Sequence, residues 1–376
     1  MKSCNFSFLT FHFSLCMYFL AFIVAFLLAV FFTYFVRKIA FRFNVVDTPG
    51  GERKIHKKPI PLLGGLAIFL SFFLVIGFFL FFTDKILAGQ ILAKHFFGIF
   101  IGGVFLMIGG VLDDKYNLRA RWQLVWPILA AIAVIVSGIG VNYVTNPFGG
   151  LLQLDSLKFV LFNFDGIPYK ITLLSDVFTF LWLIGMMYTT KLLDGLDGLV
   201  SGVTTIGAVI ICFVSLMSEV SQPETAILAI VLAGAFAGFL IWNFNPAKIF
   251  LGESGSIFAG FMLGSLSIIA GGKIATTLLI MGLPIIDVLI VIIQRLFKSR
   301  KIFSADKRHL HFRLLEAGLT QRQVVLVLYG ITFIFGISTL ILKAEGKIFA
   351  LGALFLLAIV LTVVLLKRKK KEEISK

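Results

Sequence analysis

Residues 109–115, Gly-Gly-Val-Leu-Asp-Asp-Lys, place two adjacent carboxylates at the end of an apolar run. The preceding residues 95–112 contain one ionisable side chain, His95, and are long enough to approach the span of a bilayer. Because a carboxylate is costly in lipid, Asp113 and Asp114 are expected at the water boundary or in a polar cavity. Two like charges side by side also need a cation or a proton between them. The pair therefore indicates a site for Mg²⁺ or for proton transfer, unless it only begins a solvated loop.

The whole chain is apolar, with 59% hydrophobic residues among 376. Ordinary soluble domains are less apolar, and many runs here approach the roughly 20 residues that span a bilayer. The runs are continuous and lack strand alternation, which predicts an all-α integral membrane protein. The N-terminal run is too long for a signal peptide and ends in Arg37 and Lys38, so we expect it to remain as a membrane helix. The three cysteines show no metal or disulfide spacing.

Eleven transmembrane helices are predicted from these runs. They are placed at residues 15–36, 62–83, 95–112, 122–140, 173–190, 196–218, 225–242, 254–271, 274–294, 323–342 and 348–366. Together they form one polytopic catalytic domain over residues 1–366, followed by a basic cytoplasmic tail at 367–376. Alternate loops then fall on opposite sides, and one side holds 26 of the 34 lysines and arginines. The positive-inside rule places that side in the cytoplasm and the N-terminus outside, so the net charge of +15 does not require a nucleic-acid partner.

Several candidate residues lie in the loops of the basic side. The first loop contains Arg53, Lys54 and His56, which suit phosphate oxygens but would also bind anionic lipid headgroups. Asp194 and Asp197 share one helical face, and the glycines beside them let a ligand approach the backbone. Taken alone, this acidic pattern also fits a plain loop or a weak Ca²⁺ site.

Two later segments carry further candidates. Glu253 stands at the start of a predicted helix, where the helix dipole favours either a bound metal or anion, or simply an acid of the first turn. His309 and His311 point opposite ways on a strand and do not share a helix face, so a zinc site is not indicated. With Arg308 and Arg313 they fit a phosphate or sugar site better.

Asp287 differs from the other candidates because it lies within an apolar helix. It should face the bundle interior and find a partner there. The others come from five separate loops on one side of the membrane. A cation-coupled transporter would be expected to place its ionisable groups near the midplane instead. The pattern therefore favours a catalytic cleft on the cytoplasmic face, with acids for Mg²⁺ and basic residues for phosphates.

Taken in order, the motifs resemble the polyprenyl-phosphate N-acetylhexosamine-1-phosphate transferase family, glycosyltransferase family 4. The resemblance rests on Asp47-x-Pro49, Arg53-Lys54-x-His56, Pro61-x-x-Gly64-Gly65, Asp113-Asp114-Lys115, Asp194-Gly195-Leu196-Asp197-Gly198, the run from Pro246 to Ser256, and His309-Leu310-His311. These motifs cover nearly the whole chain. The first motif and the His-x-His loop are similar to the WecA/TagO branch rather than to MraY.

The resemblance implies an activity and its setting. Members of that branch move N-acetylglucosamine-1-phosphate from its UDP sugar onto undecaprenyl phosphate and release UMP, as the first lipid-linked step of a surface glycan. The implied fold has ten or eleven helices and a cytoplasmic active site, which agrees with the topology predicted above. Mg²⁺ is the implied cofactor, with Mn²⁺ as an alternative ion. The expected location is the inner membrane, among membrane lipids, with a homodimer as one expected assembly.

The resemblance also implies residue roles. Asp113 or Asp114 is a general base or a covalent nucleophile, and both, with Glu253, match metal-binding acids. The residues implied for the nucleotide sugar are Asp194, Asp197, Lys191, Phe250, His309, His311, Arg308 and Arg313. Among them, Phe250 matches a position that stacks on uracil. Arg53, Lys54 and His56 are implied for the lipid phosphate.

Three departures from the family pattern concern this site. Glu253 stands where the family usually has Asp, Tyr188 and Lys191 stand where it usually has Asn, and Phe312 stands where it often has a further His. A lysine at a metal-lining position repels Mg²⁺. We therefore expect that Lys191 and Glu253 changed together, and that the longer Glu253 reaches either the metal or the ammonium.

Other functions are compatible with parts of this pattern. One is MraY-like transfer of a phospho-MurNAc-peptide. Another is a CDP-alcohol phosphotransferase, whose longer motif is missing from the sequence. The non-enzymatic alternative is a cation-coupled transporter. Release of UMP from a UDP sugar distinguishes the sugar-1-phosphate transferase from the CDP-alcohol phosphotransferase and from the transporter.

Overall fold

The computed structural model describes residues 3–50, 58–83, 91–145, 150–164, 167–271, 273–297 and 309–374. The helices are α1 (Ser3–Arg42), α2 (Gly64–Phe82), α3 (Ala93–Tyr116), α4 (Ala120–Val136), α5 (Leu173–Leu193), α6 (Leu199–Leu216), α7 (Pro223–Asn243), α8 (Gly252–Ile269), α9 (Ile274–Phe297), α10 (Leu310–Glu316), α11 (Gln321–Ile341) and α12 (Ala344–Ile374). The strands form three antiparallel pairs: β1 (Val46–Asp47) with β2 (Ile60–Pro61), β3 (Tyr143–Thr145) with β4 (Leu151–Gln153), and β5 (Lys158–Phe164) with β6 (Ile167–Thr172).

The prediction of an all-α multi-pass membrane protein is confirmed. Ten of the described helices are long and apolar enough to cross a membrane. The eleven predicted spans coincide with α1 to α9, α11 and α12. Of these, α4 has only 17 residues, which rise about 25 Å and fall short of a hydrocarbon core of roughly 30 Å. Helix α12 continues to Ile374 and therefore runs through most of the predicted tail.

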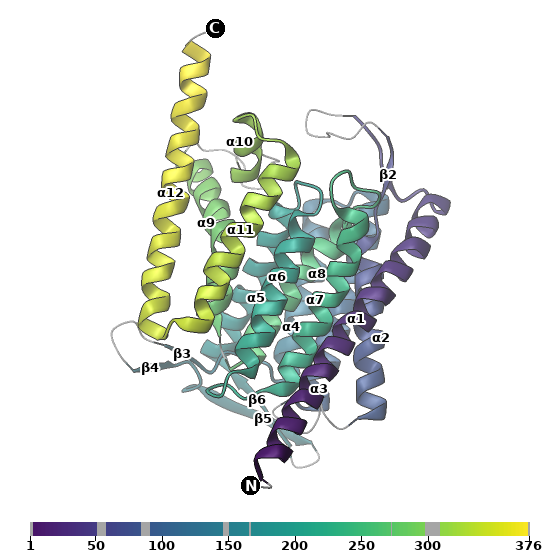
Figure 1. The fold of residues 1–376 in the computed structure, drawn as a ribbon, viewed down its shortest axis with the longest axis vertical. Helices are drawn as coiled ribbons and strands as arrows, with labels where there is room; N and C mark the ends of the chain where they lie inside the picture. The colour runs from purple at the N-terminus through teal and green to yellow at the C-terminus, as the bar shows by residue number, and fades with distance from the viewer. Residues whose placement is uncertain are drawn as a thin grey trace.

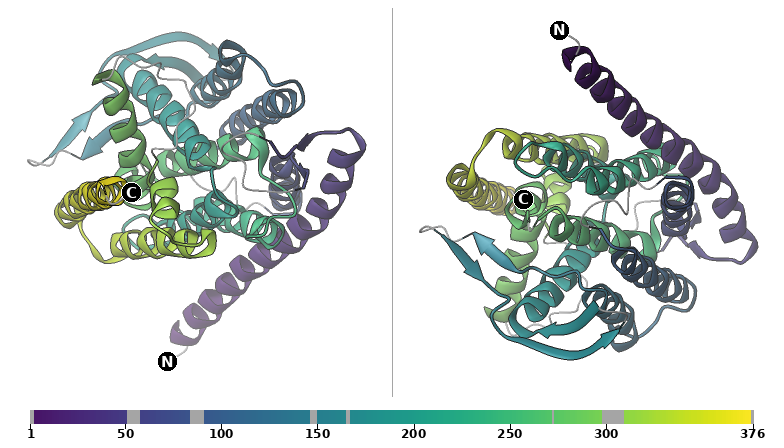
Figure 2. Two further views of the ribbon diagram at one scale, coloured as in Figure 1. Left: turned by 90° about the horizontal axis from the view of Figure 1, so that it is seen from above. Right: turned by 90° about the horizontal axis from the view of Figure 1, so that it is seen from below.

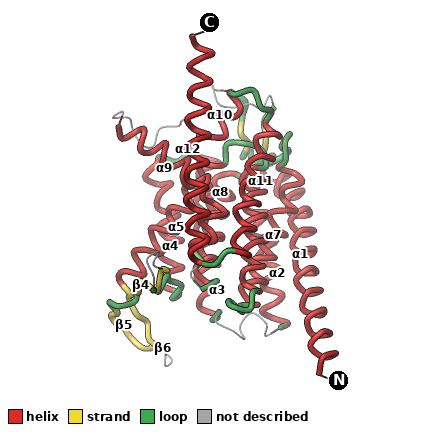
Figure 3. Tube along the Cα trace, turned by 60° about the vertical axis from the view of Figure 1, so that its left-hand side comes forward, coloured by secondary structure: helices red, strands yellow, loops and turns green. Residues whose placement is uncertain are grey.

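The helices run between two distinct ends of the bundle (Figures 1 and 3). The N-terminus and the β3–β4 and β5–β6 hairpins lie at one end, and the C-terminus, α10 and the β1–β2 pair lie at the other, which we call the α10 end. Strands β5 and β6 form an antiparallel hairpin in which Lys158 pairs with Thr172. This arrangement agrees with the predicted topology, in which successive loops lie on opposite sides of the membrane.

Helix α8 is the centre of the bundle. All but two of its 18 residues are buried, and it packs against α2, α3, α4, α5, α6, α7 and α9. Helix α1, in contrast, lies tilted along the outside, against α2 and α7 (Figure 2). The apolar residues that α1 and α12 leave exposed suit contact with lipid.

Small residues let three helices approach α8 closely. A Cβ atom added to Gly65 of α2 would lie 2.3 Å from the nitrogen of Gly255, and one added to Gly110 of α3 would lie 2.3 Å from the backbone of Ser254. A Cβ on Gly260 would lie 2.3 Å from the carbonyl oxygen of Met186 in α5. Small residues at helix interfaces favour such approach in membranes. The start of α8 is thereby held against the start of α2 and the end of α3.

Replacing Gly65 by alanine is therefore expected to destabilise the protein. The added methyl group meets backbone rather than a movable side chain, and overpacking of this kind costs about 1–3 kcal/mol. Gly77 provides a matched control on the same helix, because a Cβ added there would have no atom of the described residues within 4 Å. Thermal unfolding in detergent should show a lower transition temperature for Gly65→Ala and little change, or a small rise, for Gly77→Ala. Equal shifts for the two variants would contradict the packing described here.

Candidate active site

Several of the predicted site residues meet at the α10 end from distant parts of the chain. The last turn of α3 supplies Asp113 and Asp114, the last turn of α5 supplies Lys191, and the first turn of α8 supplies Glu253. Helix α10 brings His311 against the loop that follows α5. The structure therefore gathers these residues at one end of the bundle, close to where the apolar spans end.

Backbone hydrogen bonds fix the loop that leads into α8. The amide of Phe250 donates to the carbonyl of Pro61 at 2.9 Å, and the amide of Gly64 donates to the carbonyl of Phe250 at 3.1 Å. The amide of Gly65 donates to the carbonyl of Leu251 at 2.8 Å. The first residues of α2 and α8 are thus joined, and the start of α8 has a fixed position relative to the end of α3.

The two adjacent aspartates lie inside the last turn of α3 rather than in the loop beyond it. Helix α3 continues until Asn117 adopts a left-handed conformation with φ 51°, which is a common helix ending. Asp113 Oδ1 accepts from the amide of Leu118 at 2.7 Å and from Gln123 Nε2 at 3.0 Å. Asp114 turns the other way, toward α8. The two carboxylates therefore have separate partners.

Asp114 contacts the first turn of α8. Its Oδ1 accepts from the amide of Glu253 at 2.9 Å. Its Oδ2 is buried and has no hydrogen-bond partner among the described residues. Gly252 has φ +73°, and a Cβ there would lie 2.4 Å from Asp114 Oδ2, so both conformation and space favour glycine. A buried carboxylate oxygen without a partner indicates room for a proton or a cation.

Lys191 reaches the same place from α5. Its ammonium forms an ion pair with Glu253, and it also donates to Gln123 Oε1 at 3.0 Å. The ammonium lies 5.6 Å from the ring centroid of Tyr188, one turn earlier on α5. Of the two outcomes left open for Glu253, the structure has the one in which its carboxylate reaches the ammonium.

Asp197 supports the neighbouring loop. Its Oδ2 accepts from Asn245 Nδ2 at 2.9 Å and from the amide of Ala247 at 3.0 Å. Asn245 Nδ2 also donates to Gln321 Oε1 of α11 at 2.7 Å. On the same helix, the Tyr329 hydroxyl donates to the carbonyl of Gly198. Helix α11 thus braces both loops beside the site, and Asp197 has a structural role in addition to its predicted contact with the nucleotide.

Asp194 lies just beyond the end of α5, and its ionisation is disfavoured. Its surface is reachable by solvent, yet protein surrounds it densely. This desolvation, followed by the charges of Glu253 and Asp197, raises the pKa of Asp194 to about 8. At neutral pH most of the Asp194 population therefore carries a proton.

Asp287 finds its partner within the bundle, as predicted. Its Oδ2 lies 2.9 Å from His309 Nδ1, and its Oδ1 accepts from the amide of Leu310 at 2.9 Å. These contacts fix the start of α10. One prediction from the sequence placed His309 and His311 on a strand. In the structure, His309 is the N-cap of α10 and His311 lies within that helix. Their rings lie parallel with centroids 5.8 Å apart, because α10 begins directly after His309.

His311 packs onto the loop after α5. A Cβ added to Gly195 would lie 2.4 Å from His311 Nε2. That nitrogen is buried without a hydrogen-bond partner among the described residues. Burial, and secondarily His309, lowers the pKa of His311 to about 3, so the imidazole stays neutral at physiological pH. A neutral imidazole next to Gly195 is suited to hydrogen bonding rather than to charge pairing.

The remaining basic candidates are placed only in part. Arg313 is buried on α10 and donates from Nη2 to Gln294 Oε1 at 3.4 Å. Arg308, Arg53, Lys54 and His56 lie outside the described residues. Their predicted roles with phosphates therefore stay predictions.

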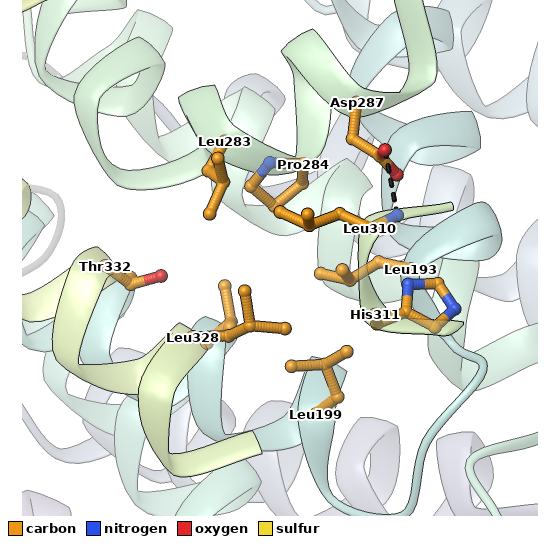
Figure 4. Close-up of a pocket in the computed structure, with 10 residues that line it drawn as sticks. Leu193, Leu199, Leu283, Pro284, Asp287, Leu310, His311, Leu328 and Thr332 are labelled. Carbon is orange, nitrogen blue, oxygen red and sulfur yellow. Dashed lines mark hydrogen bonds between the residues drawn. The ribbon is translucent and has the colours of Figure 1, made fainter. Parts of the chain in front are cut away.

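A small cavity lies behind His311, between α6, α9, α10 and α11 (Figure 4). Its volume is about 20 Å³, and it is lined mainly by leucines together with Asp287, His311 and Thr332. A space of this size has room for about one water molecule. It is much too small for a nucleotide sugar, so it does not represent the substrate site.

Sequence reasoning missed three residues that position the site. Gln123, Asn245 and Tyr329 each join elements that are far apart in sequence. In the sequence, Asn245 directly precedes the motif that begins at Pro246. This position was the only indication that Asn245 belongs to the site. Gln123 and Tyr329 belong to no recognised motif.

Fold and site define a multi-pass membrane protein with acids and an ammonium gathered at one end of its bundle. Comparison with known proteins places it more closely. The model of the family described as "Glycosyl transferase family 4" matches residues 96–271. A "Probable undecaprenyl-phosphate N-acetylglucosaminyl 1-phosphate transferase" of Bacillus subtilis is 33% identical over 351 residues, covering 92% of this chain and 90% of the relative.

Two further relatives come from other organisms. The "Decaprenyl-phosphate N-acetylglucosaminephosphotransferase" of Mycolicibacterium smegmatis is 30% identical, over 92% of this chain and 88% of the relative. A "Putative UDP-N-acetylglucosamine--dolichyl-phosphate N-acetylglucosaminephosphotransferase" of Sulfolobus acidocaldarius is 27% identical, over 77% of this chain and 86% of the relative.

The chain belongs to glycosyl transferase family 4, among the polyprenyl-phosphate N-acetylglucosamine-1-phosphate transferases. It is an enzyme that transfers a sugar phosphate, as the resemblance of its motifs implied. The MraY-like, CDP-alcohol and transporter alternatives are not favoured by these relatives.

The raised pKa of Asp194 predicts a pH-dependent stability. An unfolded Asp, with a pKa near 3.8, loses its proton at lower pH than the native residue, so this contribution is present at low pH and is lost as pH rises through about 8. Asp194→Asn removes the titration. Relative to wild type, its transition temperature should therefore be higher at pH 9 than at pH 6.

Asp155→Asn is the control for this measurement. Lys158 lowers the pKa of Asp155, so its titration lies below pH 4 and does not change between pH 6 and pH 9. If the difference between Asp194→Asn and wild type is the same at both pH values, the assignment of a protonated Asp194 is wrong.

Proposed function

We propose that the protein transfers N-acetylglucosamine-1-phosphate from UDP-N-acetylglucosamine to undecaprenyl phosphate and releases UMP. The observation that carries this proposal is the meeting of acids from α3 and α8 with the ammonium of Lys191 at one end of an apolar bundle. Such a site suits two polyanionic phosphates that must approach each other at a membrane. The names of the Bacillus subtilis and Mycolicibacterium smegmatis relatives supply the sugar and the type of lipid acceptor.

In the proposed reaction, a phosphate oxygen of the lipid attacks the β-phosphorus of the UDP sugar. The bond from that phosphorus to the oxygen bridging the two phosphates breaks, and UMP leaves with the bonding electron pair. One phosphoanhydride replaces another, so no strong driving force is needed. The second pKa of a phosphate monoester lies near 6, by analogy with phosphorylated side chains, so most of the nucleophile is already ionised at neutral pH. A strong general base is therefore unnecessary.

The acids fit a divalent cation, although no cluster of three or more His, Cys, Asp or Glu ligands occurs among the described residues. Mg²⁺ typically uses one or two carboxylates together with substrate phosphates and water. The Oδ2 of Asp114, which is buried without a hydrogen-bond partner among the described residues, supplies such a ligand. We infer that Asp114 holds Mg²⁺, or Mn²⁺, with Asp113 and Glu253 close by. A bound divalent cation would offset the negative charge of the diphosphate.

Protonation adapts the rest of the site to a polyanion. Asp194, with its raised pKa, is mostly neutral at pH 7, so it repels a diphosphate little and has a proton to donate in a hydrogen bond. His311 is neutral as well. Lys191 keeps a positive charge facing the acids. Asp197, Phe250, His309 and Arg313, and the loop residues Arg308, Arg53, Lys54 and His56, are proposed to complete the contacts with the two substrates.

The charge distribution supports the orientation of this site in the membrane. The described parts of the basic loops fall at the α10 end, and the positive-inside rule favours the cytoplasm for that end. We infer that the protein resides in the cytoplasmic membrane. A cytoplasmic UDP sugar and a lipid phosphate at the inner leaflet would then reach the site from the same side.

The proposal is tested by UMP release from UDP-N-acetylglucosamine in proteoliposomes that contain undecaprenyl phosphate. Release should depend on the lipid, stop with EDTA and return with excess Mg²⁺. A panel of other UDP sugars run in parallel defines the sugar. If no UDP sugar gives UMP under these conditions, the proposed function fails.

Asp114→Asn should abolish most of this activity. The amide keeps an oxygen for the amide of Glu253 but removes the negative charge, and the loss of one electrostatic group at such a site costs about a hundredfold or more in kcat. Asp155→Asn, at the opposite end of the bundle, should retain the wild-type rate. An Asp114→Asn enzyme that unfolds at the wild-type temperature and turns over at the wild-type rate would show that the aspartate pair only ends a helix.

A further inference from the structure

The ammonium of Lys191 is held by several groups rather than lying loose in solvent. It pairs with Glu253, donates to Gln123 Oε1 at 3.0 Å and lies 5.6 Å from the Tyr188 ring centroid. The side chains of Lys191 and Glu253 are only 21% and 16% exposed. Exposed ion pairs are weak and mobile, whereas a partly buried pair with further hydrogen bonds has a defined geometry.

Gln123 determines where this ammonium lies. Its Nε2 donates to Asp113 Oδ1 at 3.0 Å and to the carbonyl of Leu118 at 3.0 Å. Because an ammonium only donates and a carboxylate only accepts, the amide has one orientation that serves both neighbours. Gln123 therefore links Lys191 to Asp113, and Lys191 continues the chain of contacts to Glu253.

Asp114, in the last turn of α3, and Glu253, in the first turn of α8, have different partners. Glu253 already has a cation within the protein, namely Lys191. Asp114 has one oxygen bound to the amide of Glu253 and the other buried without a partner among the described residues. Glu253 Oε1 thus has an ammonium beside it, whereas Asp114 Oδ2 has no hydrogen-bond partner in the described part of the chain.

We propose that Lys191, positioned by Gln123, is a fixed internal counter-ion that keeps Glu253 from acting as a ligand for a divalent cation. The protein then offers a metal one principal ligand, the Oδ2 of Asp114. One carboxylate binds Mg²⁺ or Mn²⁺ weakly, so the ion binds firmly only together with the diphosphate of the sugar donor. This inference rests on the proposed function for the identity of the donor, but its claim about the two acids does not.

The test is Mn²⁺ binding to the purified protein without substrates, measured by electron paramagnetic resonance of the free ion. Lys191→Met removes the ammonium and frees Glu253. The affinity for Mn²⁺ should rise at least about tenfold, since a positive charge a few ångströms from a divalent ion is removed and a second carboxylate is gained. Lys191→Gln should give the same rise, and it retains hydrogen bonding to Gln123 and Glu253 should the Met variant fold poorly.

The double variant Lys191→Met with Glu253→Gln shows whether the gain passes through Glu253. The rise in affinity should then largely disappear, as expected for residues that act as a pair. Lys38→Met serves as a matched control, because Lys38 is exposed on α1, with its ammonium 4.2 Å from the Tyr34 ring centroid, and should leave Mn²⁺ affinity unchanged.

Two results would overturn the proposal. One is an unchanged Mn²⁺ affinity in folded Lys191→Met and Lys191→Gln proteins, and the other is a gain that persists in the double variant. Neither measurement uses a sugar nucleotide or lipid. A failure to release UMP would therefore count against the proposed function and leave the inference about Lys191 to be decided by Mn²⁺ binding.

Discussion

The structure depends on neutralising several carboxylates that are gathered where an apolar bundle meets water. A charged group removed from water is costly unless it is paired or hydrogen-bonded. Here each acid meets that constraint differently. Asp113 accepts two hydrogen bonds, Glu253 pairs with Lys191, and Asp194 retains a proton. Asp114 is the exception, with one oxygen left without a partner among the described residues, and that exception is where chemistry with a cationic partner is expected.

Close packing around α8 makes this arrangement of charges achievable. The amide of Glu253 reaches Asp114 only because Gly110 allows α3 to approach the backbone of Ser254. The contact of Gly65 with Gly255 fixes the other side of the same turn. A larger residue at either interface would separate the acid on α3 from the first turn of α8. The small residues therefore set the distance between the acid on α3 and the first turn of α8.

The sequence predicted those features that arise from local composition. Continuous apolar runs indicated the positions of α1 to α9, α11 and α12, because the cost of exposing polar backbone in lipid leaves a helix as the stable choice. The aspartate pair at 113 and 114 was identified because burying a carboxylate in an apolar environment costs free energy. Gln123 was missed, because a neutral amide has no such cost and its role exists only when α4 lies beside α5. Whether Glu253 reached a metal or Lys191 was likewise undecidable from sequence, since the answer depends on how α5 and α8 pack.

An exchange between two phosphoanhydrides makes modest demands on acid–base catalysis and large demands on charge. The nucleophile needs little deprotonation, but two polyanions must be brought within bonding distance. In the proposed reaction, a tethered Lys191 helps because it cannot leave with the product, and a mostly neutral Asp194 helps because it adds little repulsion. A metal that binds with the donor would add positive charge only when the diphosphate is present. The site would then avoid both an excess of negative charge when occupied and an excess of positive charge when empty.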